Sequence, residues 1–201
     1  MGDPAELRLP PSVWGSTTHL SVLDAEGNAV SLTSSTGEGC GWVLPGWGVM
    51  LNNMLGEADL NPQGFHRWRP GTRLSSMMAP TILRRDGEPQ LVLGTGGANR
   101  IRTAIAQVIW RWALQGLDLE AATAAPRLHW EAGRLDWEPG WPEAELAEAI
   151  ALSRESRAWP QPSLFFGGVH AIARSADGQL QAVGDPRRYG AASVWVEDGR
   201  F

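Results

Sequence analysis

Alternating apolar and polar residues mark four pairs of strands along the chain. Residues 20–24 and 29–33 alternate with a period of two, and the Ala-Glu-Gly-Asn between them has the composition of a turn. Three more pairs have glycine-containing turns between their strands: 81–85 with 90–94, 128–130 with 134–137, and 170–174 with 180–183. A short apolar strand is expected at 48–51. The pattern therefore predicts antiparallel hairpins.

A helical spacing appears after residue 99. Six apolar residues recur there at intervals of three and four, and the arginines at 100, 102 and 111 take other faces; the six are Ile101, Ala104, Ile105, Val108, Ile109 and Trp112. Further helices are predicted at 119–125, before Pro126, and at 142–153, with Pro142 in the first turn. Since hairpins and helices are segregated, we expect an α+β fold in which helices cover antiparallel sheets.

Three stretches lack any sustained period. Residues 1–16 contain three prolines and are interpreted as a leader or linker. Residues 34–41 are rich in serine and glycine, which makes them a candidate functional loop. Residues 56–73 have the composition of a long surface loop, in which Phe65, Trp68 and several arginines could either cover a site or pack on a partner.

The composition of the chain limits the classes of molecule that it is expected to bind. The chain has 201 residues, 43% of them apolar, which predicts one or two globular domains. Its net charge of −5 comes from 22 acidic and 17 basic residues without a run of one sign, which argues against nucleic acid and anionic membranes and favours a small or peptide-like partner. Every basic residue other than histidine is arginine, so a Schiff-base lysine and a P-loop lysine are excluded.

The cysteine and histidine content points to no cofactor. Cys40 is the single cysteine, and the four histidines are scattered, so no group has the spacing of a structural zinc site. We expect neither a metal nor another cofactor. The chain shows no signal peptide and no long apolar segment. This slightly favours a cytoplasmic location, and a signal lying upstream would instead direct the protein to the periplasm or outside the cell.

The glycine-rich stretch 94–99, Gly-Thr-Gly-Gly-Ala-Asn, lies between a predicted strand and a predicted helix. It resembles a dinucleotide-binding fingerprint, but Asn99 replaces the third glycine. We favour a turn that directs the backbone N–H groups of Gly97 and Ala98 into a cleft, where they stabilise an oxyanion. A tight turn that only requires positive φ explains the same residues.

Other polar groups allow both a functional and a structural interpretation. Thr17 and Thr18 stand at the start of the first strand, where a fixed hydroxyl is a candidate nucleophile and β-propensity alone also explains them. Ser75 and Ser76 could bind a substrate carboxylate or cap the backbone. Residues 52–57 offer two amides and Glu57, which could pair with a substrate ammonium or remain solvated.

Together these residues resemble the small, catalytic subunit of the γ-glutamyltranspeptidase family, in the N-terminal-nucleophile hydrolase superfamily. The resemblance runs from about residue 16 to 188, and its motifs occur in the family's order: 17–22 with Asp24, 27–30, 51–53, 74–77 with Pro80-Thr81, 94–101, 125–127 and 185–187. It implies a layered αββα sandwich, of which this chain is the small-subunit half.

The family mechanism implies that a precursor cuts itself between Ser16 and Thr17. Residues 1–16 would then be the leader, and residues 17–201 the catalytic small subunit. The Thr17 hydroxyl attacks the Ser16 carbonyl, the acyl group shifts from nitrogen to oxygen, and water releases the leader. The freed α-amino group is the general base, because an α-amine titrates near pH 8. A γ-glutamyl donor then acylates Thr17, and water or an amine resolves the ester.

The resemblance also assigns roles residue by residue. Gly97 and Ala98 match the oxyanion-hole pair, and Ser35 matches a threonine that hydrogen-bonds the nucleophile. Ser75 and Ser76 match the serine pair that contacts the donor's α-carboxylate. In residues 52–57, Glu57 matches an aspartate that holds the donor's α-ammonium, and Asn53 belongs to the same substrate-binding stretch.

Some positions depart from the family. Met54 stands where the family has Glu or Gln, and Gly56 replaces the first of two aspartates. We therefore expect weaker selection for a free glutamyl amine, because a missing charged hydrogen bond is worth ~1.5–3 kcal/mol. The alternatives are a cephalosporin-acylase-like amidase, and an inactive fragment or separately encoded subunit that acts only by associating with a large subunit. The large subunit is the implied partner, and without it an apolar sheet face should be uncovered.

Overall fold

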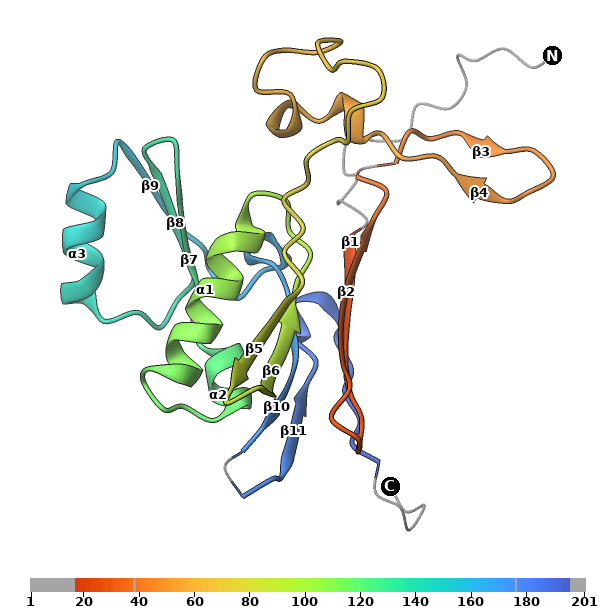
Figure 1. Cartoon of the computed structure of the whole chain (residues 1–201). Helices are drawn as coiled ribbons and strands as arrows, with labels where there is room; N and C mark the ends of the chain where they lie inside the picture. Colours follow the sequence, from red (N-terminus) through yellow and green to blue (C-terminus); the bar gives the residue numbers. More distant parts are fainter. Residues whose placement is uncertain (1–16, 38, 176, 196–201) are drawn as a thin grey trace. The chain divides into compact units, whose positions relative to one another are not determined.

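The computed structural model describes residues 17–37, 39–175 and 177–195, which form two compact units (Figure 1). The larger unit contains residues 17–34 and 75–195, and the smaller contains residues 35–74. The predicted leader, residues 1–16, lies outside the described residues. Each unit is considered separately below.

A four-stranded antiparallel sheet forms the centre of the larger unit. Its strand order is β11 (Leu180–Val183), β10 (His170–Arg174), β6 (Glu88–Gly94) and β5 (Thr81–Arg85). Leu91, Val92 and Leu93 of β6 are fully buried, because β6 is an inner strand with both faces covered. The predicted hairpins at 81–94 and 170–183 are confirmed, with β6 beginning two residues earlier than expected.

Two helices cover one face of this sheet (Figure 1). Helix α1 (Arg100–Ala113) packs on β6, and α2 (Leu119–Ala124) packs on β10 and β11. The Asp118 side chain caps α2 by accepting a hydrogen bond of 2.7 Å from the N–H of Ala121. The predicted apolar face of α1 forms the core, but Arg111 differs from the prediction: it is 5% exposed and lies over the Trp141 ring.

The predicted hairpin of β1 (Thr17–Leu23) and β2 (Ala29–Ser35) is confirmed, and β1 packs on β6 and β10. The inward residues of β1 are buried or half-buried. Four apolar residues on the outward face of the hairpin are between 46% and 51% exposed: Leu20, Val22, Val30 and Leu32. Among the described residues, the two strands pair only with each other. The expected uncovered apolar sheet face is therefore present, because no layer formed by the described residues covers these four side chains.

A second small sheet and a helix complete the larger unit. Strands β7 (Leu128–Glu131) and β8 (Arg134–Trp137) form the predicted hairpin, and α3 (Glu143–Ala151) lies within the predicted 142–153. Strand β9 (Glu155–Ala158) pairs in parallel with β8 and was not predicted. Its sequence, Glu-Ser-Arg-Ala, is exposed throughout and has no apolar alternation, so its pairing depends on the adjacent edge of β8.

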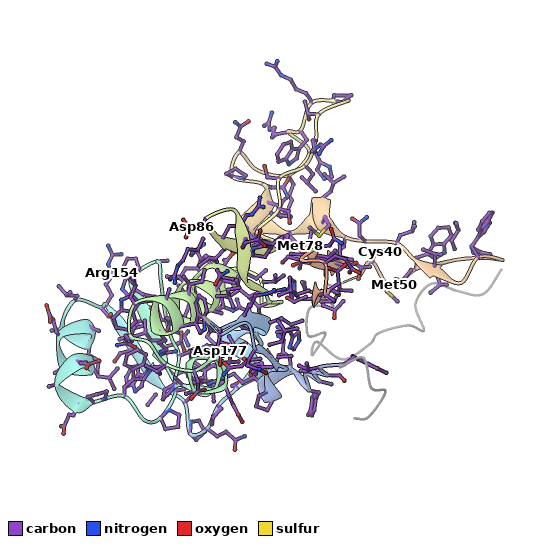
Figure 2. All side chains as sticks on the ribbon, turned by 60° about the horizontal axis from the view of Figure 1, so that its bottom comes forward. Cys40, Met50, Met78, Asp86, Arg154 and Asp177 are labelled. Atoms are coloured by element: carbon purple, nitrogen blue, oxygen red, sulfur yellow. The ribbon has the colours of Figure 1, made fainter. Side chains whose placement is uncertain are left out.

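The smaller unit consists mostly of turns and short elements. It contains β3 (Val43–Leu44), β4 (Val49–Met50) and the 3₁₀ turns η2 (Met54–Gly56) and η3 (Ala58–Leu60). Met50 belongs to β4 and Cys40 lies shortly before β3; Figure 2 labels both residues, and both side chains are exposed. Leu60 and Asn61 are the unit's buried side chains among those described. The long loop predicted at 56–73 is present apart from the turn η3 and the last residue of η2.

The fold class is α+β, as the sequence predicted. In the larger unit, a helical layer, the four-stranded sheet and the β1–β2 hairpin follow one another as three layers, as Figure 1 shows. These correspond to part of an αββα sandwich.

Candidate active site

Thr17 lies against the glycine-rich turn between β6 and α1. A Cβ atom placed on Gly96 would be 2.5 Å from the carbonyl oxygen of Thr17 and 3.0 Å from its Cβ. Real side chains do not come this close to a backbone oxygen, so only glycine permits the approach. The start of β1 and the turn therefore lie in direct contact, although about 80 residues separate them in sequence.

The turn has an unusual backbone on both of the predicted oxyanion-hole residues. Gly97 has φ +138° and Ala98 has φ +49°, and α1 begins two residues later. A left-handed conformation costs a non-glycine residue ~1–2 kcal/mol, and such strain persists where the surrounding structure enforces it. The N-terminal end of the 14-residue helix also favours negative charge at this turn.

Buried polar contacts support the turn from behind. The Thr95 hydroxyl, which is fully buried, donates to the carbonyl of Gly96 at 2.6 Å and accepts from the N–H of Gly168 at 2.8 Å. A Cβ on Gly97 would lie 3.2 Å from the Cα of Gly167. The segment 167–168 thus holds the turn through one hydroxyl and close backbone packing.

A buried network of two ion pairs contacts the backbone of this segment. Arg127 bonds to Asp185 at 2.5 Å, and Arg187 bonds to Glu138 at 2.6 Å. Arg127 also donates to the carbonyls of residues 166 and 167, each at 3.3 Å. Burial acts to lower the pKa of Arg187, but its hydrogen bond to Glu138 and the charge of Asp185 outweigh burial and raise that pKa. Through Arg127, the network therefore connects Asp185 to the carbonyls of residues 166 and 167, next to the segment that holds the turn.

Sequence reasoning gave this network no role. Arg127, Asp185 and Arg187 were noted only as parts of family motifs, and Glu138 was not noted. The one signal in the sequence is charge placed beside proline, in Pro126-Arg127 and Asp185-Pro186-Arg187. Such short motifs do not show which charges are buried together, because their partners lie up to 58 residues apart.

His19 fills the space between β1 and the sheet. Its ring nitrogens hydrogen-bond the hydroxyls of Thr33 at 2.8 Å and Ser21 at 2.9 Å. The ring occupies the place where a Cβ on Gly94 would be. Burial, with a smaller contribution from the charge of His170, lowers the pKa of His19 to about 4. His19 is therefore neutral at pH 7 and acts as a packed polar side chain.

In the smaller unit, three predicted site residues converge on Gly37. The N–H of Gly37 donates to the hydroxyl of Ser35 at 3.0 Å. The side-chain oxygens of Asn53 and Glu57 lie where a Cβ on Gly37 would be, and Gly37 has φ +66°. A hydroxyl, an amide oxygen and a carboxylate around one glycine form a group of acceptors, which is the chemistry that an ammonium ion requires. We refer to these four residues as the Gly37 cluster.

Ser75 and Ser76 belong to the larger unit and are exposed in the segment before β5. The hydroxyl of Ser76 accepts a hydrogen bond of 3.1 Å from the N–H of Met78. This contact is the backbone-capping role that the sequence allowed, and it leaves the hydroxyl proton of Ser76 able to donate elsewhere. The predicted site residues thus fall in both units, with Thr17, Gly97 and Ala98 together in the larger one.

A cavity of about 350 Å³ lies along β1 in the larger unit. It is lined by Thr18, His19 and Ser21 of β1, by His170 and by Arg188, and Thr17 does not line it. The cavity therefore does not coincide with the turn that faces Thr17. Among the described residues, no three histidine, cysteine or acidic side chains are grouped so that they could hold a metal ion. No helix in the described part of the chain is long and apolar enough to cross a membrane.

The chain resembles known proteins over most of its length. Residues 7–195 match the family model described as gamma-glutamyltranspeptidase. A glutathione hydrolase proenzyme from Bacillus subtilis is 33% identical over 184 residues, which are 90% of this chain and 31% of that protein. The acylase ACY 1 proenzyme from Pseudomonas sp. strain SE83 is also 33% identical, over 91% of this chain and 31% of that protein.

Solved structures show the same fold. Gamma-glutamyltranspeptidase from Pseudomonas nitroreducens, complexed with L-DON, superimposes with a TM-score of 0.74 at 31% identity, covering 89% of this chain and all of that chain. Cephalosporin acylase from Bacillus halodurans gives a TM-score of 0.76 at 27% identity, covering 89% of this chain and 34% of that chain. The chain spans about a third of the curated relatives that it matches. With a family model matched from residue 7 to 195, the chain belongs to the gamma-glutamyltranspeptidase family.

Proposed function

We propose that residues 17–201 form the catalytic small subunit of an N-terminal-threonine amidohydrolase or acyltransferase that cleaves γ-glutamyl amide bonds. The observation that supports this proposal is the close approach of the Thr17 carbonyl oxygen and Cβ to Gly96, next to the strained turn of Gly97 and Ala98. A nucleophile next to backbone donors at a helix N-terminus is the arrangement that acyl transfer requires.

The reaction would begin with autoproteolysis between Ser16 and Thr17. The Thr17 hydroxyl adds to the Ser16 carbonyl, the peptide C–N bond breaks as the Thr17 nitrogen takes a proton, and water hydrolyses the resulting ester. The new α-amine, with an ordinary pKa of about 8, then accepts the hydroxyl proton when Thr17 attacks a donor amide. The donor's amine leaves with that proton, and the γ-glutamyl ester passes to water or to a second amine.

The predicted substrate-binding residues belong to two different units, and each group is considered by itself. The Gly37 cluster provides acceptors for the donor's ammonium, and Ser75 and Ser76 provide hydroxyl donors for its carboxylate. Because Met54 and Gly56 add no charge to the cluster, Glu57 would be its principal anion. The donor could therefore be a γ-glutamyl compound other than glutathione.

The large subunit is the proposed partner. The chain spans 31% of the Bacillus subtilis relative, and the outward face of β1–β2 exposes four large apolar side chains. A covering sheet would bury this face and complete the sandwich. If the chain instead lacks activity, association through this face would be its remaining property. The likeness to cephalosporin acylase supports a second candidate, an amidase for another acyl group.

Co-expression with a large-subunit segment, followed by intact mass measurement, tests the proposal. We expect loss of residues 1–16 and release of amine from a chromogenic γ-glutamyl amide. Thr17→Ala should abolish both, Thr17→Ser should retain both at lower rates, and Thr18→Ala serves as the neighbouring control. A wild-type complex that is neither cleaved nor active would contradict the proposed enzymatic function. Association with the large subunit would then be the remaining proposal. Cleavage of a glutaryl amide in preference to the γ-glutamyl amide would favour the second candidate.

A further inference from the structure

The smaller unit has an open cavity of about 360 Å³ on its surface, and none of the proposed catalytic residues lines it. Its walls come from residues 61–72, a segment with almost no regular structure. The volume is at the lower end of the range for small-molecule sites, large enough for a ligand the size of an acylated amino acid. The cavity is therefore a candidate binding site to which the proposed reaction assigns no ligand.

Asn61 fixes one wall of the cavity. It is 6% exposed, and its side-chain N–H groups donate to the carbonyls of Leu55 at 3.0 Å and Glu57 at 2.7 Å. Its side-chain oxygen accepts from the indole N–H of Trp68 at 3.0 Å. Both ends of the amide are thus used, and the Trp68 ring is held in place before any ligand arrives. Such preorganisation reduces the entropic cost of binding.

The charge of this segment is opposite to that of the whole chain. Residues 61–73 contain three arginines and no acidic residue, whereas the chain carries −5. Arg67 and Arg69 both line the cavity. Among the ion pairs of the described residues, neither arginine has a carboxylate partner. Two cationic side chains at one cavity, without an internal counter-charge, favour an anionic ligand.

We propose that this cavity binds a small organic carboxylate, with Arg67 and Arg69 contacting the carboxylate and Trp68 and Pro62 contacting its apolar part. A guanidinium group matches a carboxylate through two parallel hydrogen bonds, and an indole offers a flat apolar surface. The overall negative charge of the chain disfavours a polyanion such as nucleic acid. This proposal does not rest on the chemistry of Thr17.

The indole N–H of Trp68 provides a direct probe. In the full chain labelled with ¹⁵N-tryptophan, Trp68→Phe identifies its resonance, and N-acetyl-L-phenylalanine is then added. We expect that resonance to shift with saturation, and N-acetyl-L-phenylalaninamide, which lacks the charge, to leave it unmoved. Equal shifts by the acid and the amide would overturn the proposal. So would the same shift by inorganic phosphate at equal concentration, which would indicate a general anion site, and so would no shift with any probe.

Substitutions then test the two arginines. Arg67→Gln and Arg69→Gln should each weaken binding of N-acetyl-L-phenylalanine by about tenfold, because each removes a charged hydrogen-bond donor. Arg73→Gln makes the same charge change in the same segment but does not line the cavity, so it should alter binding less than about twofold. Equal weakening of binding in all three variants would show that the affinity depends only on the net charge of the segment, and would contradict the proposed site. Thr17→Ala should bind unchanged, which separates this test from that of the proposed reaction.

Discussion

The two groups of candidate site residues are supported in different ways. The turn of Gly97 and Ala98 has buried side chains behind it, including Thr95 and the Arg127–Asp185 pair. The Gly37 cluster belongs to a unit whose buried side chains, among those described, are Leu60 and Asn61. Rigid support suits an oxyanion hole, since every acyl transfer places the same charge there, while a lightly packed cluster can change with the donor.

The largest effect is expected from breaking the support of the turn. Arg127→Ala leaves the carboxylate of Asp185 buried without this partner and should lower the free energy of unfolding by about 3–5 kcal/mol. Urea denaturation of the full chain measures this. Arg102→Ala is the matched control, because Arg102 pairs with Glu131 at the surface and should cost about 1 kcal/mol or less. Similar losses of unfolding free energy in both variants would show that the buried ion pair stabilises the fold no more than a surface pair does.

A change at the turn itself should affect chemistry more than stability. In Gly96→Ala, the new Cβ would meet the carbonyl of Thr17, so β1 must move away from the turn. A displacement of about 1 Å can reduce a rate by roughly a hundredfold. Autoproteolysis of the co-expressed complex, followed by intact mass over time, measures the loss. Gly56→Ala, which has no atom within 4 Å of the new Cβ, should process normally.

The Gly37 cluster should respond in substrate binding. Glu57→Gln removes the charge but keeps the shape, so we expect the KM for a γ-glutamyl donor to rise by about tenfold or more. Little change in the free energy of unfolding is expected from this half-buried residue. Steady-state kinetics of the co-expressed complex test this. An unchanged KM would place the donor's ammonium elsewhere, and a large loss of stability would give Glu57 a structural role.

Acid should weaken the packing of β1. The folded pKa of His19 is about 4 and the ordinary value is 6.5, so the unfolded chain binds this proton more readily. The contribution of neutral His19 is therefore complete above pH 6.5 and is lost as the pH falls from 6.5 towards 4. Urea denaturation between pH 7 and 5 should show the decline. His19→Gln should reduce the decline without removing it, because burial also lowers the pKa of His129 and of His170. His66→Asn, at an exposed position, should leave the decline unchanged.

The smallest effect is expected where the turn carries strain. Ala98→Gly removes the free-energy cost of a left-handed alanine, ~1–2 kcal/mol. Glycine also increases the conformational entropy of the unfolded chain, which favours unfolding by about 0.5–1 kcal/mol. A net gain of about 0.5–1 kcal/mol in unfolding free energy should result. Ala132→Gly, at φ +51° in the β7–β8 turn, should gain similarly without altering processing. A loss in Ala98→Gly would mean that the alanine methyl group packs usefully.

The sequence alone determined most of the regular structure. The four hairpins, α1 and α2 appear where the sequence predicted them, because burial of one face favours a period of 2.0 or 3.6. Helix α3 has no buried residue and was predicted instead from Pro142 in its first turn. The predicted site residues also came from the sequence, through the motif order. The sequence did not predict β9 because its polar residues carry no period. It set Arg111 on a face away from the apolar residues, and the pattern held no sign that this side chain is buried.

Only the tertiary structure decided which distant residues meet. It placed Thr17 against Gly96, gathered Asn53 and Glu57 at Gly37, and joined Arg127, Glu138, Asp185 and Arg187 in one buried network. These contacts depend on chain paths through space, and a local pattern holds no information about a partner dozens of residues away. The sequence alone made Thr17 a candidate nucleophile, through its place at a strand start and the family resemblance, and the tertiary structure adds its close approach to Gly96.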